Sequence, residues 1–196
     1  MFKALYKYWF RKEGWSVEGS LEPIPDKFIV IVGPHTASVD FLVGLMAKAI
    51  LNLDTIKFLG KSQLFRFPFG FIFRALGGFP VERSKDNNLV DTVTEIFNSH
   101  DKFCIALAPE GTRAKVDRLR TGFYHIAKNA RVPIYPIGFD FRTKTIIVKD
   151  AFIPGTSMAN DFKMLLEFYA KIEGKNPELG IDMTIYEKTI QPSNMY

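Results

Sequence analysis

The sequence predicts an α/β fold: a single domain with a mostly parallel central sheet flanked by helices. Two observations lead to this fold class. Short apolar runs rich in β-branched residues, which are typical of buried strands, recur along the chain. Segments with helical spacing of apolar residues lie between them, and this alternation is typical of a parallel sheet. The chain has 196 residues, which suits one such domain. We expect this domain to span 15–196, after a separate helix within 1–14.

The first predicted elements follow that N-terminal helix. Residues 27–33 read KFIVIVG, an apolar run closed by a glycine, which predicts a buried strand. From 38 to 52, apolar residues recur at helical spacing. Residues 55–60 predict a second strand, and 63–76 predict a helix that Pro68 interrupts, because proline removes a backbone N–H.

The second half of the chain repeats the alternation. FCIALA predicts a buried strand that contains Cys104, and the run MANDFKMLLEFYAKI predicts a last helix that ends at Gly174. The predicted elements are a helix near 89–97, a strand at 103–108, a helix at 122–130, strands within 132–141 and 144–150, and a helix at 158–172.

The composition excludes several classes of protein. The single cysteine, Cys104, excludes an intramolecular disulfide framework and a multi-cysteine zinc site, and it fits a reducing cytoplasm. The first twelve residues carry charges every few positions, so we expect no signal peptide. The longest apolar run, 67–73, is far shorter than the ~20 residues that span a bilayer. A net charge of +5 with 19 phenylalanines suits a membrane surface, nucleic acid or a phosphorylated ligand.

Three polar segments follow predicted strands or precede predicted helices. They are GPHTASVD at 33–40, GGFPVERSK at 77–85 and APEGTR at 108–113. In open parallel sheets, ligands bind outside the carboxyl ends of the strands, in the loops that lead into helices. The sequence therefore predicts one site at this edge of the sheet.

His35 and Asp40 are the candidate catalytic pair in the first of these segments. On one helix, five steps of about 100° would turn the two side chains about 140° apart. They can meet only if His35 lies in the loop and Asp40 in the first turns of the helix, with Ser38 or Thr36 as N-cap. The carboxylate would then fix the imidazole and leave Nε2 as a base. The alternative is a capping histidine beside an ordinary helix N-terminal aspartate.

No nucleophile accompanies the pair, because Cys104 lies inside an apolar strand where a thiol is inert. A base without a nucleophile suits direct deprotonation of a substrate hydroxyl. Four blocks strengthen this interpretation because they occur in a fixed order: HTASVD, GGFPVERS, APEGTR and VPIYPIGF. In these blocks, over 28–139, the chain resembles the glycerophospholipid acyltransferase family, in particular the 1-acylglycerol-3-phosphate (lysophosphatidate) acyltransferases.

The resemblance implies a role for each block. His35 would deprotonate the acceptor hydroxyl and Asp40 would orient it. The second and third blocks would bind the glycerol phosphate and shape the site, through Arg83, Glu110, Gly111, Thr112 and Arg113. The fourth block, around Pro133 and Pro136, would serve the acyl donor side or the fold. Many members have asparagine before the histidine and serine two residues after it, where this chain has Pro34 and Ala37, with a serine at Ser38.

The residues themselves fit a phosphorylated acceptor. Arg83 and Arg113 offer planar forks for phosphate oxygens, and Lys61 adds a point charge after the second strand. Solvated surface charges are the alternative for all three, and Glu110 could instead be structural. The acyl donor would be acyl-CoA or acyl carrier protein, a co-substrate, and neither a metal nor another cofactor is expected. Charge on the thioester carbonyl oxygen would need donors, for which backbone N–H groups of these loops are candidates.

The N-terminal segment predicts an amphipathic helix. Its apolar residues recur at i, i+3, i+4, i+7 and i+8, with cations mostly on the other side, the pattern of an interfacial anchor. Packing onto the domain is the alternative, and the phenylalanine-rich stretch 64–79 is a second candidate, for an acyl groove or for membrane contact. The apolar positions of the helix are Phe2, Leu5, Tyr6, Trp9 and Phe10.

Together these features predict a cytoplasmic acyltransferase, peripherally bound to the inner face of the cytoplasmic membrane, acting on a lysophospholipid. A thioester or lipid hydrolase that uses water with the same pair is an alternative, as is another lysolipid headgroup. A non-catalytic lipid- or nucleic-acid-binding module is disfavoured by the intact motifs. Nucleic acid is not expected, since the basic residues are scattered and form no binding motif.

Overall fold

A computed structural model describes residues 2–68, 70–81 and 89–191. Within them, one seven-stranded sheet has the order β1-β7-β6-β2-β5-β3-β4. Only β6 and β7 pair antiparallel among these strands, so the sheet is mostly parallel, as predicted. The strands are β1 (Ser16–Glu18), β2 (Lys27–Gly33), β3 (Lys57–Lys61), β4 (Gly78–Val81), β5 (Phe103–Leu107), β6 (Ile134–Asp140) and β7 (Thr145–Val148).

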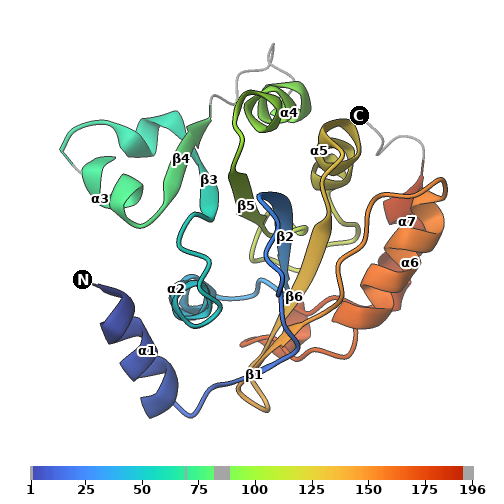
Figure 1. Cartoon of the computed structure of the whole chain (residues 1–196). Coiled ribbons are helices and arrows are strands. Elements are labelled where there is room, and N and C mark those ends of the chain that lie inside the picture. The colour runs from blue at the N-terminus through green and yellow to red at the C-terminus, as the bar shows by residue number, and fades with distance from the viewer. Residues whose placement is uncertain (1, 69, 82–88, 192–196) are drawn as a thin grey trace.

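Helices cover both faces of the sheet (Figure 1). The helices α1 and α2 lie on one face and α4, α5 and α6 on the other, while α3 lies beside the edge strands β3 and β4. The α-helices are α1 (Phe2–Lys12), α2 (Val39–Ile50), α3 (Gly70–Ala75), α4 (Leu89–Ser99), α5 (Gly122–Ala130), α6 (Met158–Tyr169) and α7 (Tyr186–Ile190). Short 3₁₀ turns span Ser62–Phe65, Pro177–Leu179 and Met183–Ile185. None of the helices in the described residues is long and apolar enough to cross a membrane.

The central strand β2 shows how the core forms on both faces. Its side chains alternate, so Phe28 and Val30 join the cluster under α1 and α2, while Ile29 and Ile31 join the cluster under α4, α5 and α6. All four residues are at most 1% exposed. A strand buried on both faces must be apolar throughout, which is why KFIVIVG was recognisable as a strand.

Several predicted elements differ from the structure. Residues 78–81 form the edge strand β4 and not a loop; Pro80 is compatible with an edge, where one N–H is not needed for pairing. The helix expected at 63–76 is a 3₁₀ turn followed by α3, and Pro68 lies in the break between them, as predicted. The helix expected to be the last ends at Tyr169, and α7 follows it.

The loop that carries His35 is held in place by α6. The hydroxyl of Tyr169, a fully buried side chain, donates to the carbonyl oxygen of Ile31 at 2.8 Å. The next position on that side, Gly33, has no room for a side chain, because a Cβ there would lie 3.0 Å from the Tyr169 ring. This close contact sets where β2 ends and where the following loop begins.

Candidate active site

His35 and Asp40 meet in the arrangement that their spacing requires. His35 lies in the loop after β2, and Asp40 lies in the first turn of α2. The Nδ1 atom of His35 is 3.0 Å from Oδ2 of Asp40. The aspartate is 3% exposed, whereas the histidine side chain is 29% exposed. With Nδ1 donating to the buried carboxylate, Nε2 is left as the acceptor nitrogen of the neutral ring.

Asp40 also organises the loop itself. Its Oδ2 accepts from the backbone N–H of Thr36 at 2.8 Å and from that of Ala37 at 2.9 Å. One buried oxygen therefore receives three donors, two of them from the backbone and one from the imidazole. The loop conformation and the orientation of the histidine are consequently set by the same atom.

Of the two N-cap candidates for α2, the structure has Ser38 at that position, but without the expected capping bond. Ser38 occupies the N-cap position, but its φ and ψ of −67° and −25° are helical, and its side chain makes no capping hydrogen bond. N-cap side chains reach the next N–H groups from the extended region, which explains the missing bond. The Ser38 hydroxyl instead accepts from Nη1 of Arg113. The Thr36 hydroxyl accepts from the backbone N–H of Asn176 at 3.1 Å.

Glu110 lies behind the histidine and not among the residues that line the cavity described below. Its Oε1 accepts from the backbone N–H of His35 at 2.6 Å, and the residue is 4% exposed. Burial raises the pKa of its carboxyl to about 7, although the His35 N–H opposes this shift. The geometry therefore supports a structural role, which the sequence had left open as the alternative to a direct role in the site.

The raised pKa of Glu110 predicts a pH-dependent stability. The folded pKa lies above the unfolded one, so this contribution is complete in acid and is lost as the pH rises through about 7. The loss is on the order of 3 kcal/mol. Glu110→Gln keeps an acceptor for His35 but cannot ionise. Its unfolding free energy relative to wild type should therefore increase between pH 4.5 and pH 8, measured in urea.

A matched variant at an exposed glutamate provides the control. Glu178 lies on the surface, so Glu178→Gln should leave the pH dependence of the wild type unchanged. If Glu110→Gln followed the wild-type curve at both pH values, ionisation of Glu110 would not be coupled to folding.

The other predicted binding residues are placed as follows. Arg113 is exposed and lines the cavity beside His35. Gly111 adopts a φ of +67°, which favours glycine and turns the chain between Glu110 and Arg113. The Thr112 hydroxyl accepts from the backbone N–H of Ala114, a local turn contact. Of the remaining two residues, Lys61 ends β3 and Arg83 lies outside the described residues.

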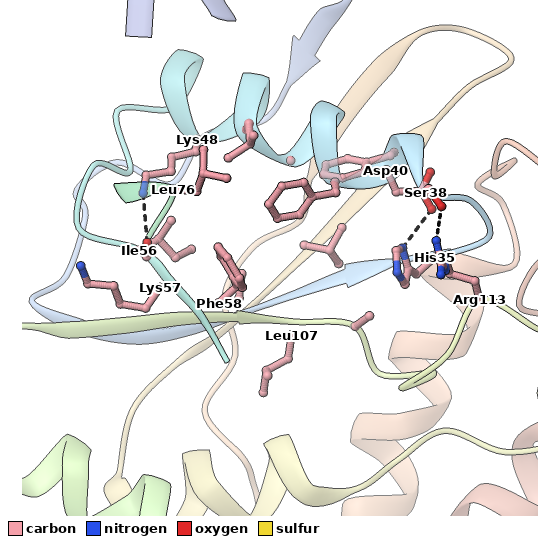
Figure 2. A pocket seen from close by; sticks show the side chains of 17 residues that line it. His35, Ser38, Asp40, Lys48, Ile56, Lys57, Phe58, Leu76, Leu107 and Arg113 are labelled. Atoms are coloured by element: carbon pink, nitrogen blue, oxygen red, sulfur yellow. Dashed lines mark hydrogen bonds and ion pairs between the residues drawn. The ribbon is translucent and has the colours of Figure 1, made fainter. Parts of the chain in front are cut away.

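A cavity of about 460 Å³ runs from the histidine along the underside of α2. His35, Ser38 and Arg113 lie at one end, and Lys48, Ile56 and Lys57 lie at the other (Figure 2). The Lys48 ammonium donates to the carbonyl oxygen of Ile56 at 3.2 Å at that far end. The rest of the lining is mostly apolar and includes Phe41, Gly44, Leu45, Phe58, Leu107 and Phe139.

The sequence offered 64–79 as an acyl groove, but within the described part of that stretch Leu76 alone lines this cavity. Its lining comes from α2, from β2, β3, β5 and β6, and from loops between elements, which are far apart along the chain. One signal was present: α2 has apolar residues nearly all round, and Val39, Phe41 and Leu42 remain exposed. A helix that is apolar on more than its core-facing side indicates a second apolar environment.

The fold and the site define a class of α/β protein. In this class, a histidine–aspartate pair at the end of a sheet strand lines an apolar cavity. The model of the acyltransferase family matches residues 17–140, more than half of the chain. The chain belongs to the acyltransferase family. The resemblance that the four sequence blocks indicated is thereby confirmed.

The chain is similar to one relative in sequence and to one solved structure in fold. The chain is 31% identical over 137 residues to a 1-acyl-sn-glycerol-3-phosphate acyltransferase from Cocos nucifera. That match covers 66% of this chain and 42% of the relative, so it spans less than half of the relative's length. The crystal structure of the 1-acyl-sn-glycerophosphate (LPA) acyltransferase PlsC from Thermotoga maritima is similar with a TM-score of 0.57 and 18% identity, over 85% of this chain and 76% of that one. This second likeness confirms the predicted fold class.

Proposed function

We propose that the protein is an O-acyltransferase that moves a fatty acyl group from a thioester to the free hydroxyl of a lysophospholipid such as 1-acylglycerol-3-phosphate. The observation that carries the proposal is the opening of the His35–Asp40 pair onto a long apolar cavity. A base beside an acyl-sized cavity suits a reaction between a hydroxyl and an acyl chain. The names of the two relatives support the acceptor.

The proposed reaction needs only the residues of the site and two substrates. Nε2 of His35 takes the proton from the acceptor hydroxyl, and the Asp40 carboxylate stabilises the imidazolium. The acceptor oxygen then attacks the thioester carbon, and the thiol of coenzyme A or acyl carrier protein leaves. No metal or further cofactor is required, because the base alone generates the nucleophile. Arg113, at the same end of the cavity, offers a cation for the acceptor phosphate.

A thiol-release assay of purified protein tests the proposal. The substrates are acyl-CoA and acyl carrier protein thioesters of several lengths, each with lysolipids that differ in headgroup. Thiol release that depends on a lysolipid, with the diacyl product identified by mass spectrometry, is the expected result. Equal release without any acceptor would identify a hydrolase instead.

The position of the cavity predicts that the residues of α2 limit the length of the acyl chain that can bind. Gly44 lines the cavity, and a Cβ there would meet only the Phe139 ring at 4.0 Å. Gly44→Met would fill this space without straining the helix, where glycine is itself unfavourable. We expect kcat/KM to fall at least tenfold for a sixteen-carbon acyl thioester, with little change for a four-carbon one. An equal fall for both would mean that acyl chains bind elsewhere.

We also propose that the protein works at a membrane surface, on its cytoplasmic side. Phe10 of α1 is 6% exposed and belongs to the core, so at this position the alternative of packing onto the domain holds. Phe2, Leu5 and Trp9 are 59%, 42% and 41% exposed, respectively. Arg11 and Lys12 at the end of the same helix are also exposed. Apolar side chains with neighbouring cations suit an anionic bilayer surface.

Vesicle co-sedimentation tests this proposal. The double variant Leu5→Ser, Trp9→Ser should bind anionic vesicles more weakly than wild type, and added salt should weaken both. Ile153 is 66% exposed but lies after β7, far from α1 in sequence, so Ile153→Ser is the matched control and should bind as wild type does. If the double variant bound like the control, α1 would not contact the membrane.

A further inference from the structure

In the loop after β2, three successive backbone N–H groups, at His35, Thr36 and Ala37, are engaged by carboxylates. The N–H of His35 donates to Glu110 at 2.6 Å. The N–H groups of Thr36 and Ala37 both donate to Asp40, at 2.8 Å and 2.9 Å. The N–H groups of His35, Thr36 and Ala37, which belong to the loops that the sequence offered as a source of donors for the thioester carbonyl oxygen, are therefore already used by carboxylates. Charge that develops on that oxygen needs a donor other than these three groups.

Two side chains beside His35 supply donors at this end of the cavity. Ser38 and Arg113 line the same cavity as the imidazole, and the arginine Nη1 donates to the serine Oγ (Figure 2). Because Oγ accepts from a cation, its own O–H is polarised and becomes a better donor. The serine makes no capping bond within α2, so its Oγ is not engaged as an acceptor by the helix backbone. Arg113 uses one of its five N–H groups in this contact.

We infer that Ser38 is a further catalytic residue: its hydroxyl, held by Arg113, donates to the thioester carbonyl oxygen as the tetrahedral intermediate forms. This inference rests on the proposed function. His35 removes the acceptor proton, the acceptor oxygen bonds to the thioester carbon, and the carbonyl π pair moves onto the oxygen that faces Ser38. The C=O bond then re-forms, the C–S bond breaks, and His35 returns the proton to the leaving thiolate. Arg113 thereby acts on the reacting carbonyl as well as on the acceptor.

Substitutions at Ser38 test the inference. Loss of one oxyanion donor typically lowers kcat by about 10²–10³-fold. Ser38→Ala should therefore lower kcat by about 100-fold, with the KM values for acceptor and donor within about twofold of wild type. Ser38→Thr retains a hydroxyl at the same position and should recover most of the lost rate. The assay is steady-state thiol release with lysophosphatidate and an acyl thioester.

A second serine provides a matched control for stability. Ser157 is the N-cap of α6 and accepts from the N–H of Asn160, so Ser157→Ala removes a real cap. That variant should lower Tm by about 2–4 °C and leave kcat unchanged. Ser38→Ala should do the reverse, with an unchanged Tm and a lowered kcat, because no capping bond is lost.

Two results would overturn the inference. One is a wild-type kcat for Ser38→Ala. The other is a raised KM for the acceptor with an unchanged kcat, which would place the hydroxyl on the headgroup. Wild-type transfer, measured in parallel, reports on the proposed function separately. If wild type transferred to no lysolipid, the proposed function would fail, and the same comparison of kcat would be made on thiol release to water.

Discussion

Replacing His35 by alanine should lower kcat for acyl transfer by about 10²–10⁴-fold, the usual effect of removing a general base. Within the described residues, the imidazole makes one side-chain hydrogen bond, to Asp40, and it lies partly exposed at the cavity rather than in the core. The variant should therefore stay folded. Its turnover is measured by thiol release with lysophosphatidate, and its folding by thermal unfolding in circular dichroism.

A second histidine, His100, provides a matched control for His35→Ala. His100 is exposed, follows the end of α4 and bonds to the carbonyl oxygen of Ile96. His100→Ala should leave turnover unchanged. Retention of wild-type turnover by His35→Ala, under conditions in which the His100 variant is also active, would show that another group removes the acceptor proton.

The meeting of His35 and Asp40 followed from the sequence because only one local geometry allows it. Five residues separate them, and a continuous helix would turn them apart. The strand KFIVIVG before the pair and the helical pattern after it placed the boundary between the two residues. Helix geometry and the boundary between strand and helix were therefore enough to predict this part of the site. The structure differs only in the N-cap, because Ser38 adopts helical dihedral angles and bonds to Arg113.

The contacts that hold the loop around the His35–Asp40 pair could not be predicted from the sequence, because the residues that make them come from distant segments. Asn176, beyond α6, donates from its side chain to the carbonyl oxygen of Thr36 at 2.8 Å, and Tyr169 fixes the end of β2. For Glu110, the sequence allowed a direct role in the site as well as a structural one, and its burial against His35 supports the structural role. Nothing in the spacing of these residues indicates such contacts, since tertiary packing alone brings them together.

For the N-terminal helix too, the sequence could not show which residues tertiary packing buries. Its apolar positions cover a broad stripe, and the sequence left open whether this stripe faces the domain or a membrane. In the structure the stripe is divided: Phe10 enters the core beneath α1, whereas Leu5 and Trp9 stay exposed. Periodicity locates the stripe but cannot divide it, because the angle at which α1 docks against α2 decides which edge is buried.

Replacing Asp40 by asparagine or by alanine should lower kcat by different amounts, because the carboxylate has two roles. Its Oδ2 accepts hydrogen bonds from the loop and the imidazole, and its negative charge stabilises the imidazolium. In Asp40→Asn, the N–H groups of Thr36 and Ala37 would hold the amide oxygen where Oδ2 now lies, so the loop and the imidazole stay oriented. Only the negative charge is lost. A charge-assisted hydrogen bond contributes about 1.5–3 kcal/mol. We therefore expect kcat to fall by about 10- to 150-fold.

Asp40→Ala removes both roles. Three donors lose a buried acceptor, so the variant should unfold at lower urea as well as lose activity to the level of His35→Ala. Asn and Ala variants are compared by thiol release and by urea unfolding, each with wild type. Equal losses of kcat in the two variants, with wild-type stability in both, would mean that the carboxylate acts on the imidazolium charge alone. The graded outcome is expected, because the same oxygen serves the base and the backbone that carries it.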